Sequence, residues 1–267
     1  MKTVVVTGST RGIGYAMVDA FLKHGCRVVV SGRTMQAVDL AIEQLSEKYP
    51  EARIFGHACN VTDPKQIQSL WDVAQSHFGQ VDIWINNAGI SAEQKKIWEH
   101  SDDSIVAVID TNIKGVIYGA RVAVRGMLAQ GFGAIYNMEG MGSDGRMHDG
   151  LSLYGTSKFA LKYFTDALVL ETRDTPLIVG ALRPGMVITD MVTDQYVGRP
   201  EELARVKRVF NIIADTADNV GPWLAEQILG NQKTGVRIKY SSIWKLLWRF
   251  LLAPFEKRDL FKDLDLR

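Results

Sequence analysis

Cysteine is scarce in this sequence, with only Cys26 and Cys59 among 267 residues. Two thiols cannot build the disulfide framework of a small secreted protein, so we expect a reducing compartment. Long apolar runs are also absent, because none reaches the ~18–20 residues that a membrane-spanning helix needs. Residues 1–7 show no signal-peptide pattern, since they run directly into a glycine turn. We therefore predict a soluble cytoplasmic protein.

Charge of one sign is not in excess either, because 31 basic and 30 acidic residues give a formal net charge of +1. A chain this close to neutral gives no reason to expect a nucleic-acid partner. His57 has no neighbour at metal-ligand spacing, so we expect no metal site. The hydrophobic content of 46% is enough for a sizeable core. No linker or repeat divides the chain, and we predict one domain over residues 1–267.

A glycine-rich turn follows the first predicted strand, the β-branched run at residues 4–6 that suits a strand buried on both faces. A helical pattern begins at Tyr15, so the turn lies between strand and helix. Backbone N–H groups and a helix N-terminus at such a junction can bind the pyrophosphate of a dinucleotide. A purely structural turn is the alternative, which this placement disfavours. The predicted contacts are Gly8, Ser9, Thr10, Arg11, Gly12, Ile13 and Gly14.

The end of the second predicted strand, residues 26–31, indicates which nicotinamide cofactor to expect. An NAD site usually has an Asp or Glu here to bind the ribose 2′-OH. This chain instead continues Ser31-Gly32-Arg33-Thr34, without an acid. Arg33 is placed to pair with a 2′-phosphate, and Arg11 could reach the same group from the glycine loop. Either arginine could instead be solvated, but together with the missing acid they favour NADPH.

Tyr154 and Lys158 lie four residues apart in a helical pattern, so their side chains leave the same face of the helix. A free phenol titrates near pH ~10, which is too weak an acid for fast proton transfer at neutral pH. An ammonium group beside it favours the phenolate, and we predict that Lys158 lowers the pKa of Tyr154. The pair alone is weak evidence, because exposed residues of any amphipathic helix can show this spacing.

Strands and helices alternate through the first four strands, the fourth predicted at residues 81–85, which indicates a parallel sheet with right-handed crossovers. Four motifs follow the glycine loop: Asn86-Asn87-Ala88-Gly89, Thr111-Asn112-Ile113-Lys114-Gly115, Tyr154-x-x-x-Lys158 and Arg183-Pro184-Gly185. In order and spacing they resemble the short-chain dehydrogenase/reductase family over about residues 3–191. The resemblance implies an α/β, single-domain Rossmann fold, a doubly wound parallel sheet of about seven strands with helices on both faces. It also implies an NADPH-dependent carbonyl reductase.

The resemblance implies a role for each motif. Tyr154 would donate a proton to the substrate carbonyl, and Lys158 would lower its pKa and hold the nicotinamide ribose. Asn112 would kink its helix and support a water-linked proton relay to Lys158. The other residues implied to line NADPH (NADP+) are Asn60, Val61, Asn87, Ala88, Gly89, Pro184, Gly185 and Thr189.

One position departs from the family pattern, which usually has a serine shortly before the tyrosine. Gly140 and Met141 occupy its place, and neither offers a hydroxyl. Ser143 is the nearest hydroxyl and our candidate for orienting the carbonyl, and Ser152 is another. An ionised Glu139 would repel a developing alkoxide, so a structural hydrogen bond is its favoured role.

The departure carries a further resemblance, because residues 137–143 read Asn-Met-Glu-Gly-Met-Gly-Ser, as in the chlorophyll(ide) b reductase branch of the family. Three later segments share this resemblance: residues 184–191, 209–213 and 235–238. It implies reduction of the formyl group of a chlorophyll b-like tetrapyrrole. Another bulky apolar carbonyl, of a steroid, retinal or fatty-acyl compound, is an alternative. A second alternative is a weak catalyst that binds a dinucleotide and acts as a sensor or scaffold. The retained tyrosine, lysine and asparagine disfavour this alternative.

Two regions lie outside these motifs. Residues 190–215 form an insertion beyond the carboxyl ends of the strands, where we predict a substrate lid. Residues 241–267 form a C-terminal extension whose apolar part, residues 243–255, is too short to span a membrane. A helix packed on its own domain or across a subunit interface is favoured, and a peripheral membrane-surface helix is the alternative. The expected partners are a small apolar carbonyl substrate and further copies in a homodimer or homotetramer.

Overall fold

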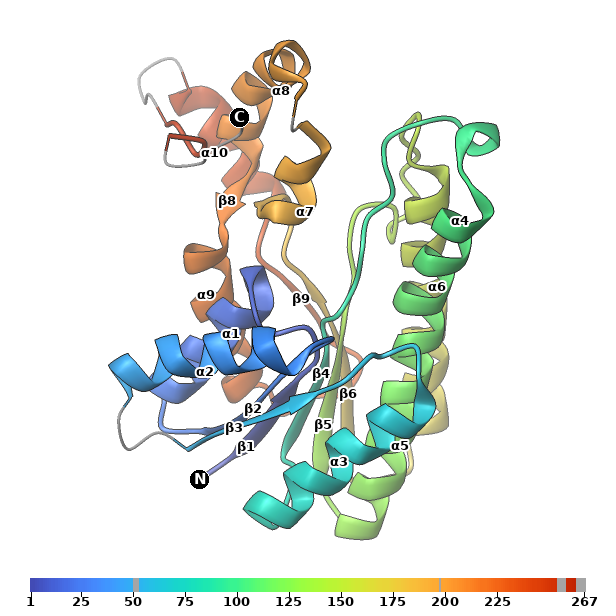
Figure 1. Cartoon of the computed structure of the whole chain (residues 1–267), viewed down its shortest axis with the longest axis vertical. Helices are drawn as coiled ribbons and strands as arrows, with labels where there is room; N and C mark the ends of the chain where they lie inside the picture. Colours follow the sequence, from blue (N-terminus) through green and yellow to red (C-terminus); the bar gives the residue numbers. More distant parts are fainter. Residues whose placement is uncertain (50–52, 197, 254–257, 263–267) are drawn as a thin grey trace.

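A seven-stranded parallel sheet organises the fold in the computed structural model, which describes residues 1–49, 53–196, 198–253 and 258–262 (Figure 1). The strand order is β3-β2-β1-β4-β5-β6-β9. The strands are β1 (Thr3–Val6), β2 (Arg27–Gly32), β3 (Ile54–Ala58), β4 (Ile83–Asn86), β5 (Gly133–Met138), β6 (Leu177–Arg183) and β9 (Arg237–Lys239). The sequence-based prediction of a doubly wound parallel sheet is confirmed.

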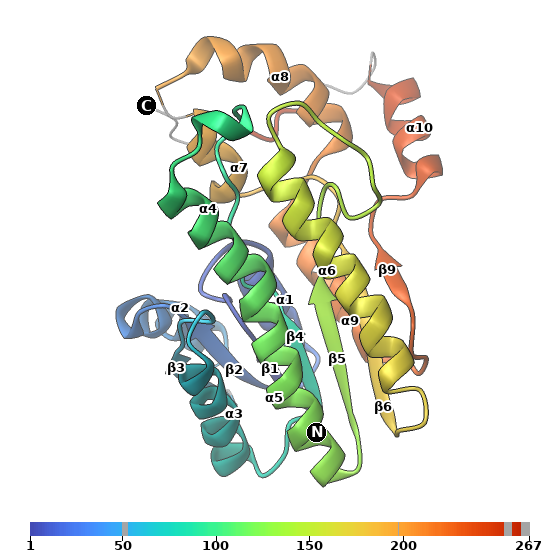
Figure 2. The same cartoon turned by 90° about the vertical axis from the view of Figure 1, so that its right-hand side faces the viewer.

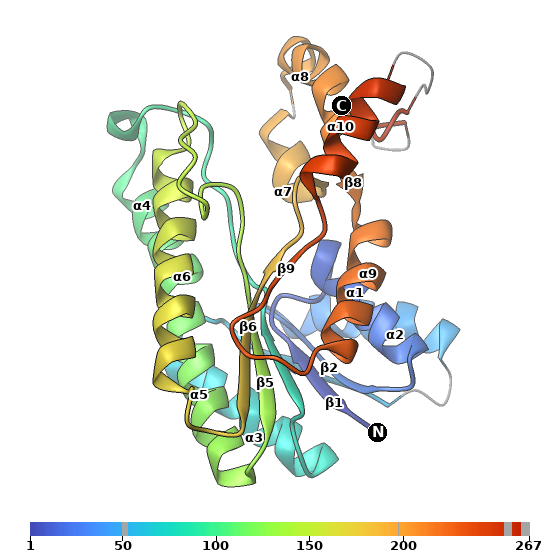
Figure 3. The same cartoon turned by 180° about the vertical axis from the view of Figure 1, so that it is seen from behind.

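Helices cover both faces of this sheet, as Figures 1 and 3 show. One face is covered by α1 (Gly12–Lys23), α2 (Met35–Lys48) and α9 (Ala217–Gly230). The other is covered by α3 (Pro64–Phe78), α5 (Gly115–Gln130) and α6 (Ser152–Glu171). Because both faces are covered, Val4, Val5 and Val6 of β1 are completely buried, as the β-branched run predicts.

The fourth strand begins two residues later than the sequence pattern predicts, at Ile83 instead of Val81. The reason is that a side chain, and not a neighbouring strand, makes the hydrogen bonds of the Val81 backbone. The amide of Gln130, at the end of α5, accepts a hydrogen bond from the Val81 N–H and donates one to the Val81 carbonyl, both at 3.1 Å. The backbone of Val81 is therefore satisfied without a neighbouring strand.

A buried chain of polar side chains ties the central strands to α6. Trp84 Nε1 donates to Asn86 Oδ1 at 2.8 Å, and Asn86 Nδ2 donates to Asn137 Oδ1 at 2.8 Å. Asn137 Nδ2 then donates to Thr165 Oγ1 at 2.9 Å, and that hydroxyl donates to the Leu161 carbonyl. Because each member has a partner, the chain fixes the register of β4, β5 and α6 without leaving a buried polar group unpaired.

Two groups of elements rise above the carboxyl ends of the strands, and Figure 2 shows one of them formed by α4 and the start of α6. This first group contains the 3₁₀ turn η1 (Ile97–Glu99) and α4 (Asp102–Ile109). The second contains β7 (Val187–Ile188), α7 (Asp190–Thr193), η3 (Asp194–Tyr196), α8 (Pro200–Ile213), β8 (Asp215–Thr216) and α10 (Ile243–Leu252). No helix within the described residues is long and apolar enough to cross a membrane.

Candidate active site

The glycine loop between β1 and α1 forms a cradle for a phosphate group. Gly8 and Gly12 have positive φ angles of 63° and 59°, which side chains other than glycine adopt with difficulty. A Cβ added at Gly14 would lie 2.4 Å from the Gly8 carbonyl oxygen, so only glycine fits there. No described side chain caps the N-terminus of α1. Its first-turn N–H groups and the positive end of its dipole therefore suit an anion, as the pyrophosphate of NADPH would require.

Ser9 shapes this loop from the inside. Its N–H donates to the Ser31 carbonyl at 2.8 Å, and its buried hydroxyl donates to the Val6 carbonyl at 2.8 Å. The same hydroxyl accepts the Ser31 N–H at 2.9 Å. These bonds hold the loop against β1 and β2, and the contact of Ser9 with a cofactor stays a prediction.

The segment after β4 closes the cradle. The Asn87 amide donates to the Thr7 and Gly8 carbonyls, both at 2.9 Å, and the Ala88 N–H donates to Thr7 Oγ1 at 3.1 Å. A Cβ added at Gly89 would lie 3.2 Å from Asn112 Oδ1 and 3.5 Å from Lys158 Nζ. The structure thus brings residues 87–89 together with the glycine loop and the catalytic candidates.

Three further residues predicted to contact the cofactor, Arg33, Asn60 and Val61, lie shortly after the ends of β2 and β3. Arg33 is exposed directly after β2, and Thr10 packs against Gly32, where an added Cβ would lie 2.6 Å from its Cγ2. Asn60 Oδ1 accepts the Thr62 N–H at 3.2 Å, and Val61 is buried against Gly115 of α5.

Arg11 has a partner that sequence did not predict. Its guanidinium pairs with Asp190 at 2.8 Å, and both side chains are exposed. An exposed pair of this kind contributes little to stability, so a bound anion can displace Asp190 from Arg11 at small cost.

The proline–glycine bend after β6 lies next to the same loop. Gly185 has a φ of +78°, and a Cβ added there would lie 2.4 Å from Ser241 Oγ. Pro184 is buried. Thr189 lies across from Gly12, since a Cβ added at Gly12 would lie 3.4 Å from its Cγ2. The start of the insertion therefore lies beside the glycine loop, while the contacts of Pro184, Gly185 and Thr189 with a cofactor stay predictions.

Tyr154 and Lys158 leave α6 on the face that looks toward the end of β5. Lys158 is only 6% exposed, and its Nζ donates to the Met138 carbonyl at 3.2 Å. The same Nζ lies 5.7 Å from the centroid of the Tyr154 ring. A Cβ added at Gly140 would lie 2.7 Å from Tyr154 Oη, so this phenol fills the place where the family pattern has a serine side chain. The missing serine side chain and the position of the Tyr154 phenol are thus linked in the structure.

The acidities of this pair differ from the sequence-based prediction. Burial raises the pKa of the Tyr154 phenol to about 12, because no charge compensates for the loss of water. Burial also lowers the pKa of the Lys158 ammonium to about 8, although the carboxylate of Glu139 acts in the opposite direction. The predicted lowering of the tyrosine pKa is therefore not found in the protein alone. The lysine ammonium lies over the ring and binds a backbone carbonyl, which leaves burial as the dominant effect.

Asn112 lies in η2 (Asp110–Lys114), a π-helical turn between α4 and α5. Its Nδ2 donates to the Ile90 carbonyl at 2.9 Å and to Ser157 Oγ at 3.0 Å, while its Oδ1 accepts the Ile90 N–H at 2.9 Å. The widened turn agrees with the predicted helix kink, because π-turns inside helices frequently occur at functional sites. The ladder of bonds holds residues 89–90 beside Lys158.

Ser143, the predicted replacement for the missing serine, lies in the turn that carries Gly140. It is buried, and its hydroxyl donates to the Gly140 carbonyl at 2.7 Å. This bond would have to break before the Ser143 hydroxyl donates to a substrate. The predicted role of Ser143 in orienting the carbonyl therefore stays a prediction. Ser152, the other candidate, is exposed at the start of α6.

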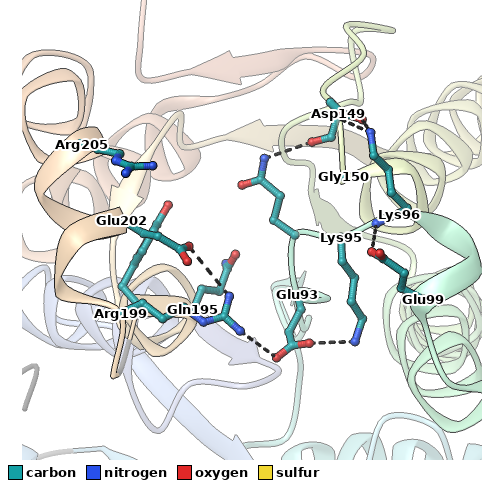
Figure 4. Close-up of a pocket in the computed structure, with 12 residues that line it drawn as sticks. Glu93, Lys95, Lys96, Glu99, Asp149, Gly150, Gln195, Arg199, Glu202 and Arg205 are labelled. Atoms are coloured by element: carbon teal, nitrogen blue, oxygen red, sulfur yellow. Dashed lines mark hydrogen bonds and ion pairs between the residues drawn. The ribbon is translucent and has the colours of Figure 1, made fainter.

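A polar pocket of about 560 Å³ lies at the outer rim, between the insertion and residues 93–99 (Figure 4). Lys96 pairs with Asp149 at 2.6 Å, which ties the loop before α4 to the loop before α6. The guanidinium of Arg199, in the insertion, lies 4.0 Å from the Glu93 carboxylate, a long ion pair. Tyr154 and Lys158 do not line this pocket, so it belongs to the entrance and not to the reacting centre.

Parallel strands that end at a glycine cradle and at a tyrosine–lysine pair place the chain among the dinucleotide-dependent oxidoreductases. The profile of the short chain dehydrogenase family matches residues 2–199, and the chain belongs to that family. The predicted family, and with it the prediction of an oxidoreductase, is confirmed.

The chain is also similar to individual members of this family. The chain is 35% identical over 230 residues to a chlorophyll(ide) b reductase of Arabidopsis thaliana, covering 84% of this chain and 64% of that protein. It is 36% identical over 191 residues to a 3alpha-hydroxysteroid dehydrogenase of Mediterraneibacter gnavus, covering 72% of this chain and 76% of that protein. The chain thus spans less than two thirds of the chlorophyll(ide) b reductase.

A solved structure shows a related fold with its cofactor. An actinorhodin polyketide ketoreductase with NADPH superposes with a TM-score of 0.80 at 25% identity, covering 90% of this chain and 95% of that one.

Proposed function

We propose that this protein is an NADPH-dependent carbonyl reductase. NADPH, when bound, supplies the hydride that adds to the carbonyl carbon. Tyr154 Oη donates the proton to the carbonyl oxygen, and the Lys158 ammonium stabilises the phenolate that remains. The observation that carries this proposal is the convergence of Tyr154, Lys158, Asn112 and Gly89 at the ends of β4 and β5, beside the glycine cradle.

Closure of the site over NADPH would bring the ribose hydroxyls to Lys158. In the protein alone its ammonium donates to the Met138 carbonyl, which leaves further N–H donors for the ribose. Loss of bulk water would then strengthen the effect of the ammonium on the phenol. We infer that the pKa of Tyr154 falls from about 12 only in the complex with NADPH.

The preference for NADPH over NADH rests on Arg33 and Arg11. Each charge-assisted hydrogen bond to a 2′-phosphate contributes ~1.5–3 kcal/mol. Arg33 is exposed, and no acidic residue lies among residues 31–34. Replacing its positive charge by a negative one, in Arg33→Asp, should therefore narrow or invert the preference for NADPH over NADH. The dissociation constants of both cofactors, measured by protein fluorescence, test this. Equal constants in the unchanged protein would refute it.

For the substrate we propose the formyl group of a chlorophyll b-like tetrapyrrole, which would be reduced to a hydroxymethyl group. The support is the chlorophyll(ide) b reductase relative and three exposed methionines, Met141 and Met147 between β5 and α6 and Met191 in α7. Unbranched thioether side chains adapt their shape to a broad flat ligand. The test incubates protein, NADPH and chlorophyllide b and identifies the product by absorption and chromatography. Turnover of another carbonyl without a hydroxymethyl product would end this substrate proposal but leave the reductase.

A steroid is the second candidate substrate, because the hydroxysteroid dehydrogenase is similar to this chain at nearly the same identity as the chlorophyll(ide) b reductase. The match also covers a larger share of the hydroxysteroid dehydrogenase, 76% against 64%. A 3-keto steroid assayed in parallel decides between them by kcat/KM. Membership of the family and the assembled tyrosine–lysine pair argue against the alternative of a dinucleotide-binding scaffold. That alternative would be supported if the protein reduced none of the carbonyl compounds tested.

Residues 190–215 are proposed to close over the substrate. The insertion contains α7 and α8, and its contacts to the opposite side include the exposed Arg11–Asp190 pair and the 4.0 Å approach of Arg199 to Glu93. Exposed pairs of this kind are weak, so the insertion can move at small cost. Protection of residues 190–213 from hydrogen exchange should increase when NADPH and substrate are bound.

We also propose that α10 contacts an anionic membrane surface. Its face at Trp244, Leu247, Trp248 and Leu251 is exposed, with values of 72%, 49%, 63% and 66%. Arg249 points inward instead, to Asp215 and to the Ala214 carbonyl at 3.0 Å. Residues 235–253 contain no acidic residue, and their two lysines, Lys239 and Lys245, contribute positive charge that complements anionic lipid. The two arginines of this segment, Arg237 and Arg249, pair with acidic side chains of the protein.

The test is flotation with vesicles of anionic or zwitterionic lipid. A double variant, Trp244→Gln with Trp248→Gln, should lose binding to anionic vesicles. Trp98→Gln, a change at a tryptophan of η1 that is 78% exposed, serves as the matched control. The opposite result is an unchanged protein that does not bind vesicles but forms a dimer, and a double variant that is monomeric. That result would assign this face of α10 to contact with a second copy of the chain. The prediction of a cytoplasmic location stays a prediction.

A further inference from the structure

A completely buried carboxylate lies next to the catalytic pair. Glu139 directly follows β5, and its side chain has no exposed surface. One carboxylate oxygen accepts a hydrogen bond from Arg183 Nε, and the other accepts one from Arg237 Nε at 3.2 Å. Arg237 also pairs with Asp166 of α6. Glu139 therefore joins the ends of three strands, β5, β6 and β9, to the helix that carries Tyr154 and Lys158.

Such a cluster needs a reason beyond stability. Removing a carboxylate from water is unfavourable, and buried ion pairs often stabilise a fold no better than apolar side chains of the same size. The two arginines share this one fully buried acid and remain partly exposed, at 19% and 25% of their side-chain surface. The carboxylate is thus the fixed centre of the cluster, and it lies on the side where the reaction would occur.

Three consecutive residues at this point make three different contacts. The Met138 carbonyl accepts the Lys158 ammonium at 3.2 Å. The Glu139 N–H donates to the Leu182 carbonyl at 2.9 Å while its side chain binds the two arginines. Gly140 presents its bare Cα to Tyr154 Oη. A shift of Glu139 would therefore move the contacts of both catalytic residues together.

We propose that Glu139 is a positioning residue for the catalytic pair: clamped by Arg183 and Arg237, it fixes residues 138–140 against Lys158 and Tyr154 and places a negative charge beside the Lys158 ammonium. This inference rests on the proposed reductase function. It explains how an acid can occupy a position next to a developing alkoxide, because the side chain is fully buried and the two guanidinium groups that bind its oxygens offset part of its charge.

The sign of the electrostatic effect can be worked out. Lys158 faces Tyr154 from its own helix, the uncharged Asn112 from η2, and Glu139 from the end of β5 with Arg183 and Arg237 behind it. Burial lowers the pKa of Lys158 to about 8, and the Glu139 carboxylate acts against this lowering. Without the carboxylate the pKa falls further, so the ammonium form is lost at lower pH. Activity that requires the ammonium then declines at lower pH.

The experiment compares the pH dependence of kcat in three variants. Glu139→Gln keeps the shape but removes the charge, and the high-pH decline should move to lower pH. Its kcat near pH 8 should fall roughly threefold to tenfold relative to pH 6. Arg237→Gln removes a neutralising cation, so its decline should move to higher pH. Asp166→Asn is the matched control, because it removes a carboxylate that binds Arg237 but that belongs to α6 and not to residues 138–140. Its decline should therefore move less than that of Glu139→Gln.

A second measurement does not depend on turnover. Lysine labelled with carbon-13 at Cε reports each ammonium by NMR, and Lys158→Met identifies the relevant signal. The Lys158 signal should titrate at lower pH in Glu139→Gln and at higher pH in Arg237→Gln. If no carbonyl compound is reduced by the unchanged protein, the proposed function fails while this titration still decides the role of Glu139.

Two results would overturn the inference. One is a Lys158 signal that titrates at the same pH in all three variants. The other is an equal change of pH profile in Glu139→Gln and Asp166→Asn, which would reduce the cluster to a structural role. If Glu139→Gln does not fold, as judged by circular dichroism, the opposite shift expected for Arg237→Gln carries the test alone.

Discussion

Restoring a side chain at Gly140 is the sharpest perturbation of this site. The family pattern has a serine there, so Gly140→Ser would appear to repair the enzyme. The structure predicts the reverse. An added Cβ would lie 2.7 Å from Tyr154 Oη and 3.3 Å from Lys158 Cε, whereas ordinary contact begins at 3.4 Å. The phenol would have to retreat by about 0.7 Å, and displacements of ~1 Å at a reacting group cost roughly 10²-fold in rate.

We therefore expect Gly140→Ser and Gly140→Ala to lower kcat by similar factors, roughly 10- to 100-fold. The comparison separates sterics from chemistry, because only serine supplies a hydroxyl. The overpacking should also destabilise the fold by ~1–3 kcal/mol, measured by urea unfolding. In a Tyr154→Phe background the clashing oxygen is absent, so the destabilisation by Gly140→Ala should shrink. A rise in kcat for Gly140→Ser, with a fall for Gly140→Ala, would refute this reasoning.

Three further changes test other parts of the structure. Asn137→Ala breaks the buried polar chain and leaves Asn86 and Thr165 short of a partner, so unfolding should need ~1–3 kcal/mol less free energy. Ser143→Ala should cost ~1 kcal/mol of stability and change kcat less than threefold if the hydroxyl serves the Gly140 turn, whereas a ~10²-fold loss would show that it orients the carbonyl. Burial would raise the pKa of Asp215, but its hydrogen bonds hold that pKa far below the ordinary value. The stability it contributes is present above pH ~4 and lost as the pH falls toward the folded-state pKa, so acid should release α10, with tryptophan fluorescence as the measure.

The fold could be predicted because its signals are local. The β-branched run at residues 4–6 and the glycine loop each determine their own structure, and β1 forms where that run predicts a strand. The start of β4 was misplaced because its competitor, Gln130, lies 49 residues away in sequence. A strand pattern contains no information about a distant side chain that takes over its hydrogen bonds.

The site shows the same division. The sequence indicated Tyr154, Lys158 and the absence of a hydroxyl at Gly140, but not that the phenol would occupy the vacated space. The predicted drop in the tyrosine pKa neglected burial, which no local pattern reports. The partner of Glu139 at Arg237 lies 98 residues away, so its hydrogen bond becomes visible only when β9 is placed beside β6.

The most direct test of the central claim is turnover of chlorophyllide b with NADPH by the unchanged protein and by Tyr154→Phe, with NADPH affinity measured in both. The account predicts that the unchanged protein forms the hydroxymethyl product, whereas Tyr154→Phe binds NADPH with nearly the same dissociation constant and forms no product. Product formation by Tyr154→Phe at the rate of the unchanged protein would contradict the assignment of Tyr154 as the proton donor.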